Sequence, residues 1–321
     1  MGLAGNGPAI EAENLVKTFK GGVLALDGVS FRAEQGSVFG LLGPNGAGKT
    51  TAVRILTTIL TPDRGTAQVL GHDVARDPAG VRGLIGLAGQ FAAVDENLTG
   101  RENLRMVGQL NHLPRARSTV RAGELLEQFD LADAANRTVK TYSGGMRRRL
   151  DLAAALVDRP PVLFLDEPTT GLDPFSRISL WAVIEGLVDD GTTVLLTTQY
   201  LEEADRLADR LVVVDRGQVI AEGTAAQLKS ELGAGVLHLE MTSDEEAEKA
   251  VAALGERLSR PASRLGSVVE LSLDQGAGDV LDALRILDAA GLAPLSLSTR
   301  EPSLDDAFLA LTGHSTTEEP T

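Results

Sequence analysis

A glycine-rich segment between an apolar run and a helical pattern constrains the fold of this chain more than any other feature. Residues 38–42 are apolar and indicate a buried strand, and helical periodicity runs from Lys49 to Ile59. The segment matches G-x-x-x-x-G-K-[ST] in full, through Gly43, Pro44, Asn45, Gly46, Ala47, Gly48, Lys49 and Thr50. Strand, loop and helix in this order are the context that a phosphate-binding loop requires.

The residue types of this loop predict how it would bind a nucleotide. Glycines let the backbone wrap tightly, so that its N–H groups point at phosphate oxygens beside a helix N-terminus. We expect Lys49 to supply positive charge to the β- and γ-phosphates and the Thr50 hydroxyl to ligate Mg²⁺. Thr51 belongs to the same predicted ATP-binding segment. The alternative, a chance glycine-rich turn, is disfavoured by the strand and the helix on either side.

A second apolar run, residues 162–165, ends in the two carboxylates Asp166 and Glu167. A carboxylate at the C-terminal end of a buried strand lies where ligands gather in open α/β sheets, beside the phosphate loop. We expect Asp166 to hold Mg²⁺ and Glu167 to orient or deprotonate the attacking water. Two solvated turn residues are the alternative, and the presence of the phosphate loop argues against it.

A third motif, between the other two, indicates the family. Tyr142-Ser143-Gly144-Gly145-Met146 opens a predicted helix upstream of Asp166. It resembles the Leu-Ser-Gly-Gly-Gln signature of ABC transporter ATPases, with Tyr for Leu and Met for Gln. The resemblance covers roughly residues 10–225, and the order and spacing of the three motifs make it specific.

The resemblance implies further roles. Phe19 is similar to the aromatic residue that stacks on adenine, and Gln90 to the glutamine that senses Mg²⁺ and the attacking water. Asp173, in Gly-Leu-Asp-Pro, is similar to the aspartate that communicates across a dimer. The implied ATP-binding residues are Phe19, Gly43, Pro44, Asn45, Gly46, Ala47, Gly48, Lys49, Thr50, Thr51, Gln90, Ser143, Gly144, Gly145 and Asp173, and the implied metal ligands are Thr50, Gln90 and Asp166.

The resemblance also implies a homodimer. In this family, Ser143 and Gly145 would contact the γ-phosphate bound by Lys49 of a second copy, so that two chains enclose two ATP molecules head to tail. One position departs from the family, because Gln199 stands where a histidine usually contacts the γ-phosphate. Glutamine can donate a hydrogen bond but cannot be cationic. We therefore expect working but slow hydrolysis, with Glu167, Gln199 and Lys49 as the catalytic candidates.

Two further segments are similar to the daunorubicin/doxorubicin-resistance ATPases, residues 199–205 and 302–313. This resemblance implies an exporter of a drug or lipid-like compound, with a separate polytopic membrane permease subunit and a place on the cytoplasmic face of the cell membrane. No run approaches the ~20 apolar residues that a spanning helix needs.

Two other functions compete with this one. The first is a soluble non-transport ABC ATPase that acts on nucleic acid or ribosomes, and a net charge of −15 disfavours it. The run Arg147-Arg148-Arg149 is expected to lie on a solvated helix face rather than on nucleic acid. The second is a regulatory nucleotide-binding module without turnover, against which Lys49, Asp166 and Glu167 argue.

Strands and helices alternate along the first two thirds of the chain, which predicts a mostly parallel sheet covered by helices. The resemblance makes this a RecA-like core with antiparallel β and helical subdomains, in a nucleotide-binding domain of residues 1–232 with its helical subdomain at about 91–158. Alternating apolar residues at 236–241, 268–273 and 295–299 predict strands of a small C-terminal α/β domain, residues 233–313. Ser303 and Asp306 form a helix-cap pattern there, and residues 314–321 are expected to be a disordered tail.

Overall fold

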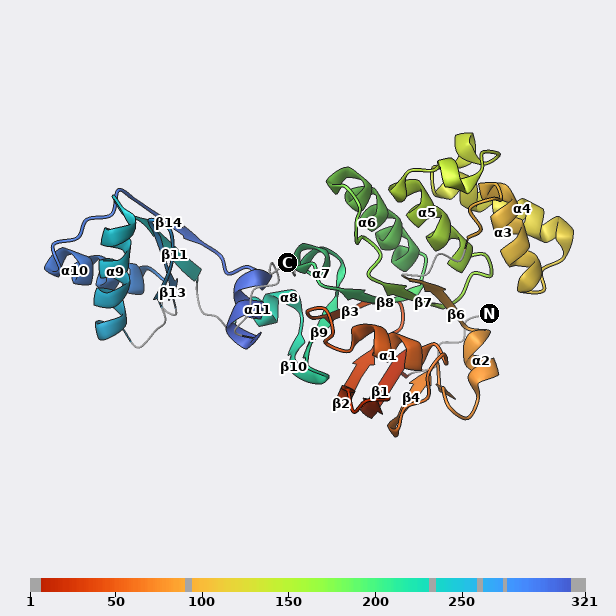
Figure 1. Ribbon diagram of the computed structural model, residues 1–321, viewed down its shortest axis with the longest axis horizontal. Coiled ribbons are helices and arrows are strands. Elements are labelled where there is room, and N and C mark those ends of the chain that lie inside the picture. Colours follow the sequence, from red (N-terminus) through yellow and green to blue (C-terminus); the bar gives the residue numbers. More distant parts are fainter. Residues whose placement is uncertain (1–6, 90–93, 231–234, 259–261, 274–275, 313–321) are drawn as a thin grey trace. The chain divides into compact units, whose positions relative to one another are not determined.

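The computed structural model describes residues 7–89, 94–230, 235–258, 262–273 and 276–312 (Figure 1). It divides into two compact units, Met1–Thr224 and Ala225–Thr321. The division precedes α8 (Ala225–Ser230), because this helix packs against α11 (Leu304–Thr312) of the second unit. The predicted boundary between residues 232 and 233 therefore differs from the one in the structure. It lies outside the described residues, as do Gln90, residue 91 and the predicted tail.

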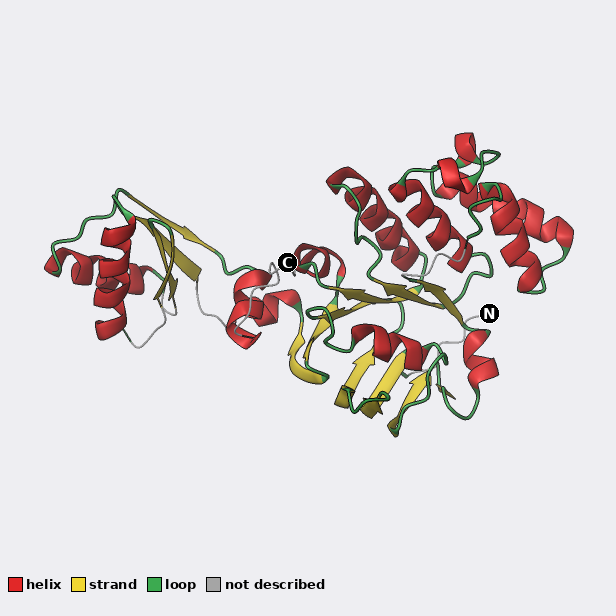
Figure 2. Ribbon diagram, viewed as in Figure 1, coloured by secondary structure: helices red, strands yellow, loops and turns green. Residues whose placement is uncertain are grey.

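A six-stranded sheet forms the centre of the first unit, with strand order β10-β9-β3-β8-β7-β6 (Figure 2). The strands are β3 (Val38–Leu42), β6 (Ile85–Ala88), β7 (Val162–Asp166), β8 (Thr193–Thr198), β9 (Arg210–Asp215) and β10 (Gln218–Gly223). All neighbours are parallel except β9 and β10. Every residue of β3, β7 and β8 is buried, as expected for strands covered on both faces. The predicted mostly parallel sheet is confirmed.

An antiparallel sheet lies on one side of α1 (Lys49–Leu56), and the central sheet lies on the other (Figure 1). Its strands are β1 (Ile10–Thr18), β2 (Leu24–Ala33), β4 (Arg64–Val69) and β5 (His72–Asp73), in the order β2-β1-β4-β5. The helix contributes Val53 and Ile55 to a core shared by both sheets, in which Phe31 of β2 stacks on Phe39 of β3. Burial on both sides fixes α1, and with it the position of Lys49.

Helices cover the other face of the central sheet (Figure 2). They are α3 (Gly100–Leu110), α4 (Arg115–Gln128), α5 (Gly144–Ala155), α6 (Pro174–Asp189) and α7 (Leu201–Leu207), and α2 (Pro78–Arg82) precedes β6. Alternate residues of β7 enter the two cores: Phe164 faces α1, whereas Leu163 and Leu165 pack among the helices with Trp181. Among the described residues, no helix is long and apolar enough to cross a membrane.

The second unit contains an antiparallel sheet of order β12-β13-β11-β14, with two helices against one face. The elements are β11 (Gly235–Glu240), α9 (Asp244–Arg257), β12 (Ala262–Leu265), β13 (Val268–Leu273), α10 (Ala277–Ala289) and β14 (Ser296–Arg300). Leu237, Leu239 and Leu271 alternate toward the helices and pack against Leu254 and Leu287. In β11 and β13 the alternation that predicted the strands is therefore the alternation between this core and the open face, whereas Leu295 and Leu297, which predicted the third strand, are exposed.

The N-terminus of α11 is held by the cap predicted from the sequence. Ser303 Oγ accepts from the Asp306 backbone N–H at 3.2 Å, and Asp306 Oδ2 accepts from the Ser303 N–H at 2.7 Å. The Arg300 guanidinium adds a two-pronged ion pair to Asp306 and donates from Nε to His238 Nε2 at 2.6 Å. His238 thus has a structural role, joining β11 to the end of β14.

This ion pair predicts a pH-dependent stability of the second unit. Partial burial raises the pKa of Asp306, but hydrogen bonds from Arg300 and Ser303 outweigh it and lower the pKa to about 2, from 3.8. The folded pKa lies below the unfolded one, so the stabilisation is present above pH 4 and is lost as the pH falls toward 2. With allowance for solvent screening, Asp306→Asn should lower the free energy of unfolding by about 1–2 kcal/mol at pH 7.

Urea unfolding of the full chain at pH 7 and pH 3, followed by circular dichroism, measures this effect. The difference between wild type and Asp306→Asn should shrink at pH 3. The matched control is Asp305→Asn, since Asp305 is the exposed neighbour on the same helix. Equal losses from the two variants would contradict the assignment.

Candidate functional site

The loop between β3 and α1 owes its shape to glycines at positions of close backbone approach. A Cβ atom at Gly43 would lie 2.2 Å from the carbonyl oxygen of Val214, and one at Gly48 would lie 2.4 Å from that of Ala25. Gly48 also has φ 108°, in the left-handed region that favours glycine. The loop backbone therefore rests directly on the backbones of two strands, and larger residues would force it away.

The loop surrounds a small cavity at the N-terminus of α1. The cavity has a volume of about 190 Å³ and is lined by Ala25, Asn45, Gly46, Ala47, Gly48, Lys49, Thr50, Thr51 and Glu167. Free backbone N–H groups and the helix dipole make such a terminus favourable for anions, and no acidic residue occupies the first turn of α1. Of the predicted loop residues, those from Asn45 to Thr51 thus converge with Glu167 on one cavity suited to phosphate, whereas Gly43 and Pro44 do not line it.

Lys49 lies inside this cavity as a buried cation, 4% exposed. Its Nζ donates to the carbonyl oxygens of Gly43 at 2.6 Å and Pro44 at 3.0 Å, and lies 3.5 Å from Glu167 Oε1. Burial lowers the pKa of Lys49, and the nearby Glu167 carboxylate opposes this shift. The ammonium group is thus held within the loop, beside Glu167, another of the predicted catalytic residues.

Asp166 ends β7 and faces two hydroxyl groups. Its Oδ1 accepts from Thr50 Oγ1 at 3.2 Å and from Thr197 Oγ1 at 2.6 Å. Hydroxyl and carboxylate oxygens are donors that suit Mg²⁺, which usually takes one or two protein oxygens together with substrate phosphates and water. Among the residues that the structure describes, no three acidic or histidine side chains are grouped so that they could hold a metal ion, and a Mg²⁺ bound largely through phosphates does not require such a group.

Glu167 follows Asp166 in an unusual backbone conformation, with φ 50°. Its N–H is held by the carbonyl and the hydroxyl oxygens of Thr197, both at 3.1 Å, and Thr170 Oγ1 donates to its Oε2 at 3.4 Å. A non-glycine residue in a rare conformation costs roughly 1–3 kcal/mol and persists only where its surroundings fix it. The turn places the carboxylate in the cavity beside Lys49.

Gln199 and Phe19 lie in different relations to the cavity. Gln199 is half-buried and directly follows β8, whose last residue, Thr198, pairs with Leu42 and accepts from the N–H of Gly43 at 3.3 Å. It therefore lies at the same sheet edge as the loop. Phe19 lies in the turn between β1 and β2, is 37% exposed and does not line the cavity.

The signature residues lie together with Asp173 but not in the cavity. Ser143 is exposed and caps α5, accepting from the Met146 N–H at 3.2 Å, and Asp173 caps α6, accepting from the Ser176 N–H at 2.9 Å. A Cβ atom at Gly145 would lie 2.7 Å from Ser176 Oγ, so the two helix starts are in contact. Neither of these helix starts lines the cavity of its own chain.

The sequence prediction for the three arginines of α5 is wrong for Arg148. Arg147 pairs with Glu96 at 2.7 Å and Arg149 with Asp130 at 3.3 Å, as residues at a solvated face do. Arg148 instead turns inward and donates to backbone carbonyls around the end of β7. The sequence does not separate Arg148 from Arg149, because both follow the buried Gly145 by about one helical turn and lie on its side of the helix.

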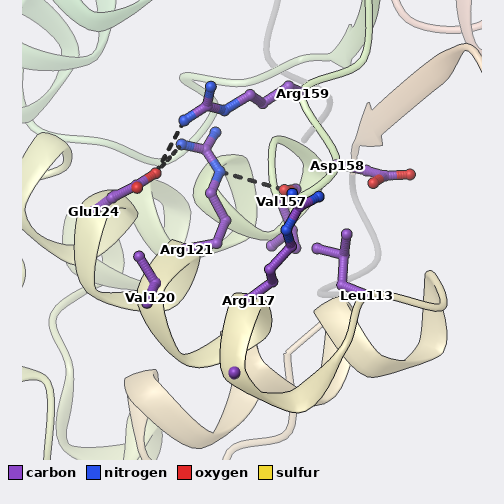
Figure 3. A pocket seen from close by; sticks show the side chains of 9 residues that line it. Leu113, Arg117, Val120, Arg121, Glu124, Val157, Asp158 and Arg159 are labelled. Carbon is purple, nitrogen blue, oxygen red and sulfur yellow. Dashed lines mark hydrogen bonds and ion pairs between the residues drawn. The ribbon is translucent and has the colours of Figure 1, made fainter.

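A separate hollow of about 590 Å³ lies between α4 and the end of α5 (Figure 3). Arg121 reaches across it, donating to the carbonyl oxygens of Leu156 at 2.9 Å and Val157 at 3.3 Å. Glu124 accepts from both Arg121 and Arg159, as Figure 3 shows. These contacts hold α4 against α5, so we assign this hollow a structural role.

The six-stranded sheet, the glycine loop and the two carboxylates at its edge define a phosphate-loop nucleotide hydrolase. The sequence profile of the family described as ABC transporter matches residues 26–170. The daunorubicin/doxorubicin resistance ATP-binding protein of Streptomyces peucetius is 52% identical over 95% of this chain and 93% of its own. The chain belongs to the ABC transporter ATP-binding proteins of the daunorubicin/doxorubicin-resistance type, as its motifs predicted, and is an ATPase.

Other relatives and solved structures agree with this family. A Nod factor export ATP-binding protein of Paraburkholderia xenovorans is 39% identical over 95% of this chain and 97% of its own, and the linearmycin resistance ATP-binding protein of Bacillus subtilis is 35% identical over 95% and 98%. The solved ATP-binding subunit of an ABC transporter has a TM-score of 0.62 at 28% identity, covering 70% of this chain and 92% of its own. A dimeric ATP-binding cassette with ADP and phosphate bound has a TM-score of 0.62 at 25% identity, covering 67% and 98%. The predicted fold class is confirmed.

Proposed function

We propose that this chain dimerises around ATP and drives the efflux of a drug or lipid-like compound through a separate polytopic membrane subunit. The observation that carries the proposal is the cavity in which Lys49, Thr50 and Glu167 meet, with Asp166 behind them. The names of the relatives supply the substrate class, since they concern drug resistance and export. None of these names concerns nucleic acid, so nothing favours the non-transport alternative.

We propose the following division of roles in ATP hydrolysis. The loop N–H groups and Lys49 bind the β- and γ-phosphates, and Asp166 with Thr50 would hold Mg²⁺. When bound, that ion neutralises charge on the phosphates. Glu167 orients the attacking water and accepts its proton, for which its carboxylate is already aimed into the cavity.

The residues outside the cavity complete the proposal. Ser143, Gly144 and Gly145 would bind the γ-phosphate held by a second copy, because they lie at the exposed start of α5 and do not line their own chain's cavity. Asp173 would then face the same partner. Repeating one pair of surfaces about a two-fold axis gives a closed homodimer with two ATP molecules. Loss of the γ-phosphate on hydrolysis would remove the contact between the two copies, and the homodimer would loosen.

The remaining assignments follow from the same comparison with the family. Phe19 would stack on the adenine ring, and Gln90 would contact Mg²⁺ and water from the segment that follows β6. The helical region that begins near residue 91 would dock on the membrane subunit, so that the chain lies peripherally on the cytoplasmic face of the membrane. Coexpression with a candidate permease tests this last point. The chain should move to the membrane fraction only when the permease is present, and cofractionation with ribosomes would contradict it.

Gln199 provides a test of the γ-phosphate contact. Gln199→Ala should lower kcat by about 3- to 10-fold, because a neutral hydrogen bond contributes roughly 0.5–1.5 kcal/mol. Gln199→His should raise turnover above that of the wild type and add a pH dependence near pH 6–7, since imidazole titrates there and an amide does not. Phosphate release and ATP affinity, measured from pH 5.5 to 8.5, give both results. Unchanged turnover and affinity in Gln199→Ala would exclude this role.

A further inference from the structure

The Arg148 guanidinium is bound to the backbone at the ends of two neighbouring strands. Its Nη1 donates to the carbonyl oxygen of Gly89, one residue after β6, at 2.6 Å. Its Nη2 donates to the carbonyl oxygens of Asp166 at 3.1 Å and Glu167 at 2.9 Å. Its Nε donates to that of Pro168 at 2.6 Å. One side chain of α5 therefore gathers four carbonyl groups, three of them from consecutive residues around the catalytic carboxylates.

These four carbonyl oxygens are the direct hydrogen-bond partners of a largely buried cation. Burial lowers the pKa of Arg148, and the more distant carboxylates of Asp151, Asp166, Glu203 and Glu167 only oppose this shift. No carboxylate lies within ion-pair distance of Arg148 among the described residues. A buried charge is costly unless hydrogen bonds satisfy it. Burial of the guanidinium is therefore favourable only when the backbone adopts the conformation in which all four carbonyl groups point at it.

That backbone includes the turn that aims Glu167. Thr197 holds the N–H of Glu167 on one side, and Arg148 holds its carbonyl on the other. Between them the residue adopts φ 50°, a conformation that is unfavourable without external contacts. Arg148 thus supplies one of the two anchors of the strained turn.

Arg148 also belongs to the helix that begins with the signature. Ser143 caps α5, and Arg148 lies in the second turn of the same helix. A shift of α5 along or about its axis would change all four Arg148 hydrogen bonds together. The position of the helix start is therefore connected, within one chain, to the geometry of Glu167.

We propose that Arg148 is a positioning residue for ATP hydrolysis, which fixes the Glu167 turn and makes its geometry depend on the position of α5. The inference rests on the proposed role of Glu167 as the residue that activates water. It assigns to Arg148 no contact with nucleotide. A second copy that engages the start of α5 would thereby align the carboxylate of the chain it touches.

Arg148→Met tests this proposal, with phosphate release measured over a range of Mg²⁺-ATP concentrations. We expect kcat to fall by about 10- to 100-fold, because displacement of a catalytic group by about 1 Å can cost 10²-fold. KM and the affinity for a non-hydrolysable ATP analogue should stay within about threefold, since the loop and Lys49 are untouched. Arg148→Lys keeps one charged donor and should recover part of the loss in kcat.

Three controls make the outcome decisive. Arg149→Met removes the neighbouring arginine, whose contacts are with Asp130 and the Phe129 carbonyl rather than with the end of β7, and should leave kcat nearly unchanged. In a Glu167→Gln background, Arg148→Met should lower the residual turnover no further, because the residue acts through Glu167. Thermal unfolding of each variant identifies loss of fold, and Arg148→Lys then carries the test.

An unchanged kcat in Arg148→Met would overturn the proposal. So would a parallel loss of kcat and analogue affinity, or an equal loss in Arg149→Met, since either would indicate a general structural role. The wild type serves as a separate test: if it releases no phosphate, the proposed activity fails, whereas an active wild type with an active Arg148→Met variant refutes only the role of Arg148.

Discussion

Glu167→Gln should lower the steady-state turnover of ATP by about 10²- to 10⁴-fold, the range that general acid–base catalysis contributes. Glutamine has nearly the same shape as glutamate, so the loop, Lys49 and Asp166 keep their places. Its amide cannot accept the proton of the attacking water. ATP should therefore bind and remain intact, and the ATP-bound homodimer should accumulate.

Phosphate release and light scattering after gel filtration, both with saturating Mg²⁺-ATP, measure the two halves of this prediction. The variant should be a monomer without nucleotide and a dimer with it. Glu202→Gln is the matched control, because Glu202 is an exposed carboxylate that pairs with Arg177. A Glu167→Gln variant that stays monomeric at saturating ATP would contradict the proposed mechanism.

Lys49→Ala should weaken ATP binding by about 10- to 100-fold, since a charge-assisted hydrogen bond contributes roughly 1.5–3 kcal/mol. The buried ammonium lies between the carbonyl groups of the loop and Glu167, where the phosphates are proposed to bind. Its removal also leaves the Glu167 carboxylate buried beside the incoming phosphates without a cation. We expect kcat/KM to fall further than the affinity does, because both effects then act on the transition state.

Isothermal titration calorimetry with a non-hydrolysable ATP analogue measures the affinity, and phosphate release measures kcat/KM. Lys249→Ala is the control, since Lys249 is an exposed lysine with an ion pair to Glu245 on α9. Lys49→Arg separates charge from shape: the longer, planar guanidinium would occupy the part of the cavity in which the phosphates are proposed to bind, so catalysis should still be lost. Wild-type affinity in Lys49→Ala would exclude Lys49 from the phosphate site.

The central strands could be predicted from the sequence because they are covered on both faces. Such strands form continuous apolar runs, as β3 and β7 do. The antiparallel strands β1 and β2 left a weaker signal, since irregularities in their register interrupt the alternation of buried and exposed residues. The helical subdomain predicted for about residues 91–158 was not divided into its helices, although Pro114 marks the break between α3 and α4.

The meeting of Lys49, Thr50, Asp166 and Glu167 could be predicted because parallel strands end at one edge of a sheet. The contacts of Arg148 could not, since its partners are backbone carbonyls and carbonyls are present at every residue. The left-handed turn at Glu167 was equally hidden, because Thr197 fixes it from another strand. Sequence patterns predicted which side chains meet at the cavity, whereas the groups that hold them in place depend on tertiary packing.

The close approach of the glycine loop to β2 and β9 has a consequence for folding of the chain during its synthesis on the ribosome. Gly43 rests on Val214, and the N–H of Gly217 donates to Ala47 of the loop at 3.0 Å. Val214 and Gly217 lie about 170 residues after the loop in the chain and are synthesised much later. A nascent chain that has emerged only as far as α7 therefore lacks the β9 and turn residues that support the loop backbone. ATP can assist folding by mass action only after β9 and the following turn have left the exit tunnel.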